Sequence, residues 1–309
     1  MVKVCDVNSV TSTNFEIGVC KRIEYLNIFS QDSKISFTKE LIDFSSFRPL
    51  VEFFDVSVGV QESTDKVSKK KASSSFPAGT GVFVISNHEL ARLNLQEEEK
   101  KIIKKYLDSS DVSRYSIHFN NQYLIYSDNA AREKIHRGIY PNIKQHLDHL
   151  KQFITSSNRP YGLHRPREQR FFESPKLICK TMFSRPSFTL DDKSYYVGFS
   201  FSLIVARQSD ISIKYLLGLL NSNFANYWFH LHGKKRGGDL DVGVGVYRQF
   251  PVAAESSSQT GTLIAAKEES ERIAIQRQID ATDRQIDQLV YKLYGLTDGE
   301  IDIVEGSKE

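Results

Sequence analysis

The chain has 309 residues, a net charge of +3 at pH 7 and 40% hydrophobic residues, which predicts one large domain or two smaller ones with an ample core. Cys5, Cys20 and Cys179 are scattered without Cys-x-x-Cys spacing, so we expect reduced thiols and no disulfide framework. No stretch approaches the roughly 20 apolar residues of a membrane span, and the N-terminus lacks the apolar core of a signal peptide. We therefore expect a cytoplasmic protein.

The N-terminal third predicts strands, an exposed loop and a helix. Residues 50–61 mix apolar alternation with a continuous apolar run, as in a partly buried strand. Residues 65–81 are rich in serine, lysine and glycine without apolar periodicity, which indicates an exposed loop. A short buried strand is expected over residues 82–86, and Asn87 offers an N-cap for a helix over residues 88–107.

The next segment predicts a hairpin followed by a helix. Residues 113–119 and 122–127 are rich in β-branched and aromatic residues, and the Asn-Asn pair between them marks a turn. Residues 130–154 place apolar side chains at helical spacing, with Pro141 near a first turn. The apolar positions of this helix are Ile139, Ile143, Leu147, Leu150 and Ile154.

A loop and three strand-like segments come next. Residues 156–170 indicate a loop by their proline and glycine content. The strand-like segments are 175–183, 188–197 and 201–206, with a turn expected at the Asp-Asp-Lys step within the second.

Residues 213–251 join an apolar helical run to a basic, glycine-rich hinge and then to a strand. The helix is expected to bury its apolar residues and so to hold a mobile cationic loop on a rigid support. Such a loop suits contact with phosphates. The buried residues are expected to be Leu216, Leu219, Leu220 and Phe224, and the loop residues Lys234, Lys235, Arg236, Gly237 and Gly238.

Residues 253–262 indicate a linker of small residues, and a long helix ending at Gly295 follows it. This helix has a heptad-like apolar seam that is broken once by threonine. Because the seam spans only about three heptads, we expect the helix to pack on its own domain rather than to form a free coiled coil. The seam residues are Ile275, Ile279, Thr282, Ile286, Leu289 and Leu293.

Positive charge is concentrated in one segment. Residues 130–185 contain twelve Lys or Arg against four Asp or Glu, a net +8 that leaves −5 for the rest of the chain. Segregated charge of this kind produces a local positive potential that attracts polyanions. The alternative is an ordinary solvated basic surface. A second cationic site, for phosphate contact or only for solubility, is Lys69, Lys70 and Lys71.

Within the basic segment, a proline-containing loop interleaves arginines with one tyrosine and one histidine. The planar guanidinium fork binds phosphate or pairs with guanine in the major groove, and tyrosine packs against a base or sugar. The alternative is a salt-bridged loop in which Arg167 or Arg170 pairs with Glu168 or Glu173. The cluster consists of Arg159, Tyr161, His164, Arg165, Arg167 and Arg170.

Catalytic and metal signals are weak by comparison. Two histidine pairs, at 146 and 149 and at 230 and 232, lack nearby ligands at zinc-site spacing. The triplets at residues 98–100 and 191–193 match the letters of a nuclease Asp/Glu-x-Lys motif, but lie in an expected helix and turn rather than on adjacent strands. Phosphate-loop, dinucleotide-binding and nucleophile-elbow motifs are absent as well. We predict no catalytic residue and no metal site.

Seven stretches in order resemble the TaqI-like specificity domain, the target-recognition region of adenine-specific DNA methyltransferases and type IIG restriction-modification enzymes. The resemblance spans most of the chain. It is carried by VGVQESTDKVSKK with GVFVIS, SSDVSRYSIHFNNQYLIYSD, REKIHRGIYPNIKQHL, RPREQRFFESPKLIC, YLLGLLNSNFANYWF, YRQFPV and IDQLVYKLYGLTDGEIDIVEG.

The resemblance has one marked departure. In the family this region follows a methyltransferase domain with an Asn-Pro-Pro-Tyr-type motif, and no two prolines are adjacent in this chain. The glycine motif that binds the methyl donor is also missing. The resemblance therefore implies a specificity half alone, as a fragment, a separate subunit or a remnant, that is not an enzyme by itself. S-adenosylmethionine is expected only on a catalytic partner domain.

The resemblance implies an α+β fold, a mixed-sheet target-recognition domain with a C-terminal helical tail. We expect a recognition region over residues 1–252 with a further boundary near 110–130, a linker over 253–262 and a tail over 263–309. The implied function is sequence-specific binding of double-stranded DNA; the alternatives are a Mg-dependent nuclease and a protein-interaction module acting through the C-terminal helix. Besides the arginine cluster and Lys69 to Lys71, the DNA-facing residues are expected to be Lys180, Arg185, Lys234, Lys235, Arg236 and Arg248.

Overall fold

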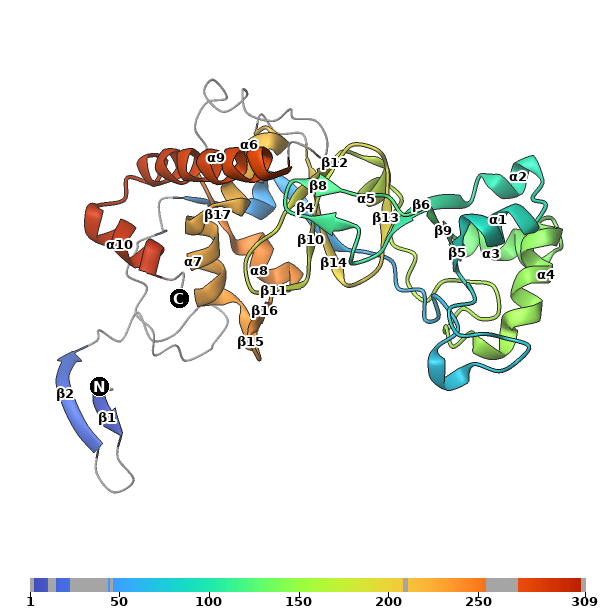
Figure 1. The fold of residues 1–309 in the computed structure, drawn as a ribbon, viewed down its shortest axis with the longest axis horizontal. Coiled ribbons are helices and arrows are strands. Elements are labelled where there is room, and N and C mark those ends of the chain that lie inside the picture. The colour runs from blue at the N-terminus through green and yellow to red at the C-terminus, as the bar shows by residue number, and fades with distance from the viewer. Residues whose placement is uncertain are drawn as a thin grey trace. The chain divides into compact units, whose positions relative to one another are not determined.

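A computed structural model describes residues 3–10, 15–22, 44, 47–207, 211–253 and 272–306. The chain forms two compact units, Met1–Ser46 and Phe47–Glu309 (Figure 1). The first unit contains one antiparallel pair, β1 (Lys3–Val10) and β2 (Phe15–Arg22), whose register places Cys5 opposite Cys20.

An antiparallel four-stranded sheet lies at the centre of the second unit. Its two middle strands bury consecutive residues, so both faces of the sheet are covered. Ile178 and Leu203 face the core shared with α5 (Arg170–Glu173), whereas Cys179 on the other face contacts Tyr247 of α8 (Val244–Gln249). Across the sheet the strands are β12 (Thr189–Asp191), β10 (Lys176–Lys180), β14 (Phe201–Ala206) and β4 (Phe54–Val58).

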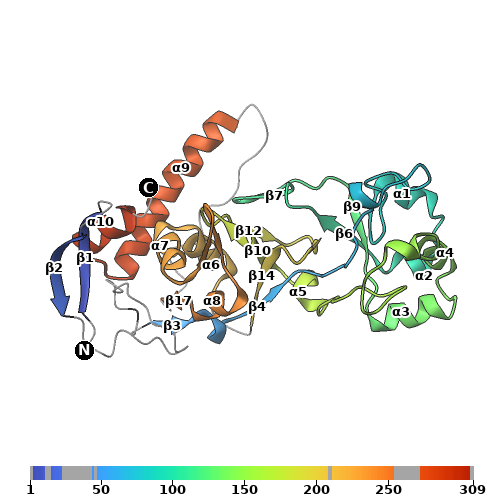
Figure 2. The same ribbon diagram turned by 90° about the horizontal axis from the view of Figure 1, so that it is seen from below.

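A second four-stranded sheet is mixed. Its strand β13 runs parallel to β6, and the remaining pairs are antiparallel. Helices α1 to α4 belong to the lobe around it, and Figures 1 and 2 agree in placing the central sheet between this lobe and helices α6 to α8. The predicted α+β class is confirmed. The elements are β13 (Tyr196–Val197), β6 (Ile103–Leu107), β9 (Gln122–Ile125), β5 (Val84–Ser86), α1 (Asn87–Arg92), α2 (Glu97–Lys100), α3 (Asn129–His136) and α4 (Pro141–Leu150).

Three smaller sheets and three 3-10 turns complete the strand and turn structure. One small sheet has the order β11 (Met182–Phe183), β16 (Asp239–Asp241) and β15 (Lys234–Arg236); the others pair β17 (Pro251–Val252) with β3 (Arg48–Pro49) and β7 (Val112–Ser113) with β8 (Ser116–Ile117). The 3-10 turns are η2 (Leu50–Glu52), η3 (Lys69–Lys71) and η4 (Lys151–Phe153).

The C-terminal helices attach to the body through polar contacts as well as aromatic packing. The side chains of Arg114 and Tyr115 donate to Asp283, and the backbone N–H of Asn223 donates to Asp287 at 2.7 Å. The ring of Tyr294 stacks against Phe224. The C-terminal helices are α9 (Arg272–Leu293) and α10 (Asp298–Gly306). The helices of the body beside them are α6 (Ile213–Asn221) and α7 (Asn223–His232).

The heptad-like seam predicted for the long helix is not its buried face. Leu289 is 45% exposed, Ile286 is half-buried, and the side chains at 275 and 279 lie outside the described residues. Among the side chains of α9 from residue 280 onward, which the structure describes, the buried ones are instead Asp283, Asp287, Val290 and Tyr291. Carboxylates are tolerated there because α7 and the β7–β8 hairpin present donors to them, and a periodicity search for apolar residues overlooks such positions.

The prediction of one continuous helix over residues 88–107 is wrong. The N-cap is Ser86 rather than Asn87, because Ser86 forms a capping box with Glu89. The chain leaves α1 after Arg92, makes the single turn α2, and then enters strand β6. The apolar pair at 102 and 103 is compatible with a helix or a strand. These residues lead into a strand because β6 pairs with β9 and β13.

The hairpin predicted around the Asn-Asn pair is also wrong. Strand β8 pairs with β7 through a tight turn in which Tyr115 has a φ of 64°. Strand β9 lies between β5 and β6 instead. The turn residue Asn121 does adopt a left-handed φ of 54°, so the signal marked a turn but not its strand partners.

Two predicted helices are each two helices. Gly138, with a φ of 76°, separates α3 from α4, and Pro141 is the first residue of α4. As a result Ile139 is 52% exposed, whereas the four later apolar positions are buried as predicted. Ser222 similarly separates α6 from α7, and its side chain caps α7. The segment predicted as a strand before Pro251 is the short helix α8.

Candidate nucleic-acid interface

One end of the central sheet brings together several of the predicted cations. Strands β4 and β10 both run antiparallel to β14, so their C-terminal ends lie at the same end of the sheet. Lys180, the last residue of β10, is exposed and lies opposite Phe201, the first residue of β14. We call this position the sheet end. It is built by backbone pairing, so it is fixed by the fold rather than by a loop.

The loop over residues 156–170, which carries the arginine cluster and which we call the arginine loop, is joined to the sheet end by two backbone hydrogen bonds. The backbone N–H groups of Gln61 and Arg165 donate to each other's carbonyl oxygens at 2.9 and 3.0 Å. The Nε of Arg167 lies 3.4 Å from the carbonyl oxygen of Gly59. Burial lowers the pKa of Arg167, and the neighbouring Arg165 guanidinium lowers it further, which indicates a local positive potential.

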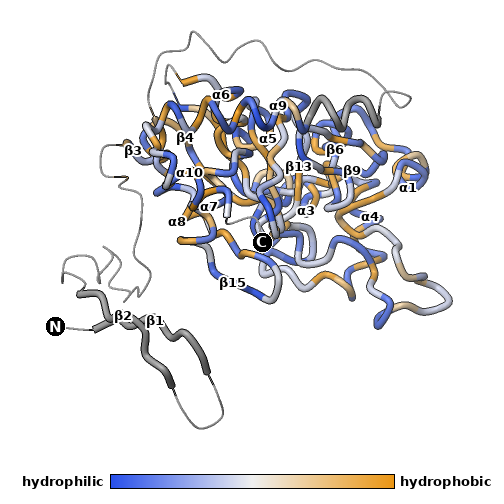
Figure 3. The backbone as a smooth tube through the Cα atoms, turned by 60° about the vertical axis from the view of Figure 1, so that its left-hand side comes forward, coloured by the Kyte–Doolittle hydropathy of each residue, from blue (hydrophilic) through white to orange (hydrophobic). Residues whose placement is uncertain are grey.

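The predicted mobile loop at residues 234–238 is an ordered hairpin beside the same end. The chain passes from Lys180 through Thr181, whose carbonyl oxygen accepts from the N–H of Val242 at 2.9 Å, into the β11–β16–β15 sheet. Gly237, with a φ of 61°, forms the hairpin turn. Strand β15 is exposed along its length and coloured hydrophilic in Figure 3. The basic residues are therefore held in a strand, not in a flexible hinge.

Four of these cations have no acidic partner among the described residues. They contrast with Arg236, whose Nε donates to Asp241 at 2.7 Å. An exposed cation without an ion pair binds an external anion without first breaking an internal contact. The four, which we call the free cations, are Arg165, Lys180, Lys234 and Lys235.

Arg170 lies elsewhere and is ion-paired. Its guanidinium donates to Asp55 and to Glu168, each at 2.8 Å. Asp55 lies opposite Val205, toward the other end of the central sheet. The salt-bridged alternative is thus confirmed for Arg170.

The remaining predicted contacts are dispersed over other elements. The ring of Tyr161 is buried and its hydroxyl donates to Asp148 at 2.7 Å, so this side chain anchors the arginine loop to α4. The Nδ1 of His164 accepts from the N–H of Ser157. Arg185 donates to Asn223 at the start of α7. The exposed remainder is Lys69, Lys70 and Lys71 on η3, Arg159 in the loop and Arg248 on α8.

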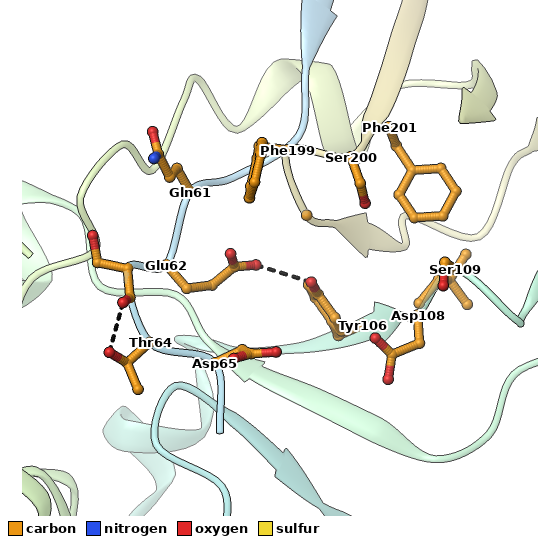
Figure 4. Close-up of a pocket in the computed structure, with 13 residues that line it drawn as sticks. Gln61, Glu62, Thr64, Asp65, Tyr106, Asp108, Ser109, Phe199, Ser200 and Phe201 are labelled. Carbon is orange, nitrogen blue, oxygen red and sulfur yellow. Dashed lines mark hydrogen bonds between the residues drawn. The ribbon is translucent and has the colours of Figure 1, made fainter. Parts of the chain in front are cut away.

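A polar pocket of about 480 Å³ opens beside the sheet end, and Figure 4 shows its lining. Its innermost carboxylate is Glu62, 6% exposed, which accepts from the hydroxyl of Tyr106 at 2.9 Å. Burial raises the pKa of Glu62 to about 7, and the nearby Asp65 and Asp108 carboxylates act in the same direction. The turn between β13 and β14 forms the wall that the pocket shares with the sheet end.

Glu62 makes the stability of the chain pH-dependent. Its pKa is about 7 in the fold against 4.5 for an unperturbed glutamate, so between these values the folded chain holds a proton that the unfolded chain has lost. Its contribution therefore destabilises the fold increasingly as pH rises through this window, by roughly 3 kcal/mol in all. We expect Glu62→Gln to gain stability relative to wild type between pH 4.5 and pH 7.5, measured by urea unfolding. Parallel pH profiles for the two proteins would contradict this.

Sequence reasoning missed the turn between β13 and β14. Phe199 at its tip is 58% exposed and lines the pocket. The run from 195 to 206 is almost continuously apolar. It therefore predicted two strands, and nothing in it indicated an exposed aromatic side chain between them. Gly198 was the available signal, since a glycine inside an apolar run marks a close backbone approach.

The acidic-lysine triplets that suggested a nuclease have structural roles. Glu99 accepts from the backbone N–H groups of Asn142 and Ile143 and so caps α4. Asp191 is buried against Lys176 at 2.5 Å. Within the described ranges, no group of three or more His, Cys, Asp or Glu side chains has an arrangement that would hold a metal ion.

Comparison with known proteins bears on the central part of the chain. Residues 104–240 match the family model described as the TaqI-like C-terminal specificity domain. The predicted resemblance is confirmed. The TaqI-like match includes Arg165, Lys180 and Lys234, together with the turn that carries Phe199. Residues 104–240 are thus similar to a TaqI-like C-terminal specificity domain.

Two relatives extend the TaqI-like match. The Type II methyltransferase M.MjaIV of Methanocaldococcus jannaschii is 26% identical over 175 residues, which are 50% of this chain and 55% of that protein. The chain therefore aligns with about half the length of that relative. The type IIL restriction-modification enzyme MmeI, solved in complex with DNA, has a TM-score of 0.54 and 13% identity over 85% of this chain and 35% of its own. The likeness to MmeI concerns the fold.

None of the helices that the structure describes combines the length and apolar character needed to cross a membrane.

Proposed function

We propose that the chain binds double-stranded DNA sequence-specifically, as the target-recognition part of an adenine-specific methyltransferase or type IIG restriction-modification system. The free cations carry this proposal, because the fold gathers them at one rigid sheet end inside or beside the TaqI-like match. Phosphate contacts supply salt-dependent affinity and fix the register of a protein on the duplex.

Discrimination between bases requires a second set of side chains at the same surface. The ordered sheet end offers such groups, since the amide of Gln61 and the guanidinium of Arg167 lie beside Arg165. Arginine pairs with guanine and glutamine with adenine through two hydrogen bonds each in the major groove. We infer that the free cations position the duplex and that their polar neighbours read it.

The catalytic step is assigned to a partner. The chain has neither adjacent prolines nor the donor-binding glycine motif, so its residues do not fit S-adenosylmethionine or the catalytic pocket in which an adenine is methylated. We place both on a methyltransferase or nuclease domain, in the same parent chain or in a separate subunit. Restriction-modification systems act on DNA in the cytoplasm, so we place the chain there.

Fluorescence anisotropy with a labelled duplex of random sequence tests DNA binding. We expect micromolar affinity or better at low salt and a steep linear fall of log K with log salt, as for release of counterions from several phosphates. The chain alone should neither cleave plasmid in Mg²⁺ nor transfer a methyl group from S-adenosylmethionine. Failure to bind duplex at low salt contradicts the proposal, and Mg-dependent cleavage abolished by Asp192→Ala would favour a nuclease.

A further inference from the structure

An exposed aromatic side chain stands at the sheet end on a rigid turn. The N–H of Phe201 donates to the carbonyl oxygen of Gly198 at 3.1 Å, which closes a four-residue turn with Phe199 near its tip. Both flanks of the turn are held by backbone hydrogen bonds: the N–H of Val60 donates to the carbonyl oxygen of Val197 at 2.9 Å, and the N–H of Gly59 donates to that of Phe201 at 3.0 Å. Phe199 is therefore presented by ordered backbone, although it is the most exposed large apolar residue described.

The turn is also pressed against the wall of the polar pocket. A Cβ added to Gly198 would come within 2.6 Å of the Tyr106 hydroxyl and 3.4 Å of a Glu62 carboxylate oxygen. Only glycine allows this approach, so the position of the turn over Glu62 and Tyr106 is a constrained feature of the fold. Figure 4 shows Phe199 above Glu62, at the edge of the pocket.

The turn that carries Phe199 adjoins two regions of opposite charge. On one side Lys180 and Arg165 are held at the sheet end by backbone pairing with Phe201 and Gln61. On the other side the pocket contains the carboxylates of Glu62 and Asp108, the latter 3.5 Å from the ammonium of Lys66. An anion is attracted to the first side and repelled from the second. A hydrogen-bond donor is favoured in the pocket.

This order matches the chemistry of a single nucleotide, which has an anionic phosphate, an apolar ring face and, on the major-groove edge of adenine and cytosine, an exocyclic amine; guanine and thymine carry a carbonyl oxygen at that position. Aromatic side chains stack on the ring faces of unstacked bases, and apolar wedges enter base steps in several DNA-bending proteins. Carboxylates accept from exocyclic amines. A carboxylate pocket would repel a phosphate, which leaves the base edge as the part that enters it.

Resting on the proposed function, we propose that Phe199 stacks on an adenine or cytosine displaced from the duplex stack, with the amine of that base directed to the pocket oxygens of Glu62. The free cations then hold the adjoining phosphates. Phe199 is thus a base-contacting residue for the recognition step, and the pocket selects bases whose major-groove edge carries an amine.

The test compares Phe199→Ala and Phe199→Tyr with wild type, using a duplex enriched by the wild-type chain from a randomised pool. Stacking on one base is worth about 1–3 kcal/mol, so we expect Phe199→Ala to weaken binding about 5- to 150-fold and Phe199→Tyr to retain most of the affinity. The salt dependence should stay unchanged, because no phosphate contact is lost. Ile139→Ala, which removes another exposed apolar side chain far from the sheet end in sequence, should bind like wild type.

Two further measurements, of 2-aminopurine fluorescence and of base preference, distinguish stacking from a general loss of affinity. 2-Aminopurine placed singly along the duplex should brighten beside the displaced base with the wild-type chain, because the probe then loses a stacking neighbour, and remain quenched with Phe199→Ala. Glu62→Gln, with its fold checked by urea unfolding, should lose preference for adenine or cytosine at that position, because an amide offers a donor as well as an acceptor.

The outcomes also separate this inference from the function on which it rests. If the wild-type chain binds no duplex, the proposed function fails. If wild type binds with its steep salt dependence but Phe199→Ala binds equally well and no 2-aminopurine brightens, the stacking inference is overturned while the proposed function stands. If Phe199→Ala weakens binding but Phe199→Tyr does not restore it, stacking is overturned as the cause.

Discussion

Replacing Asp191 with asparagine is expected to lower the free energy of unfolding by about 3–5 kcal/mol, because it leaves the charge of Lys176 buried without its anionic partner. Both side chains are 0% exposed, and the ammonium of Lys176 lies 2.5 Å from the Asp191 carboxylate. Burial lowers the pKa of Lys176, and Asp191 opposes that shift. Asp191 also accepts from the N–H groups of Lys193 and Tyr195, which fixes the turn leading to β13.

Asp192→Asn provides the matched control for this prediction. Asp192 is the next residue in the chain, is exposed, and belongs to the same triplet that resembled a nuclease motif. Its replacement should change stability by less than about 0.5 kcal/mol. Urea denaturation followed by circular dichroism measures both variants. Equal midpoints for the two would show that the buried pair does not support the central sheet.

Removing three of the free cations is expected to weaken binding to every duplex sequence alike. In the combined variant Arg165→Gln, Lys180→Gln and Lys234→Gln, each lost phosphate contact should reduce the slope of log K against log salt by about 0.9, or roughly 2.7 together. These side chains are exposed and have no acidic partner among the described residues, so their loss should leave stability nearly unchanged. Anisotropy titrations across a salt series measure the slope.

The control changes the same net charge on other elements. Lys100 at the end of α2 and Lys101, its C-cap, pair with Glu97 and Glu98, and Lys292 lies exposed on α9. Replacing these three lysines with glutamine should leave the salt slope within about 0.5 of wild type, because only cations that meet phosphates release counterions. An equal loss of slope in both triple variants would mean that net charge, rather than the sheet end, governs binding.

Local sequence patterns predicted many of the helices and strands, but they did not predict which strands pair with each other. The segment of β5 was predicted as a buried strand, those of β10 and β14 as strands, and the apolar face of α4 from its spacing. Pairing was not predictable in the same way, because β9 suits a hairpin with its chain neighbour as well as its true place between β5 and β6. Register depends on contacts between residues far apart in the chain.

The candidate site shows the same division. The basic composition of residues 130–185 indicated where cations would gather, but it did not distinguish the free Arg165 from the ion-paired Arg170, since Asp55 lies 115 positions away in sequence. Tyr161 was expected to face a base, yet its ring is buried beneath the loop. The exposure of Phe199 could not be predicted from the apolar run that contains it. Exposure at a turn depends on the positions of the two strands that the turn joins.

The most direct test of sequence-specific recognition is selection of duplexes from a randomised pool by the wild-type chain at physiological salt. We predict enrichment of one short motif that contains an adenine or cytosine needed for binding, with each single-base change costing about 1–3 kcal/mol. A pool that stays random after repeated rounds, although the chain binds duplex at low salt, would contradict recognition and leave only a non-specific polyanion-binding surface.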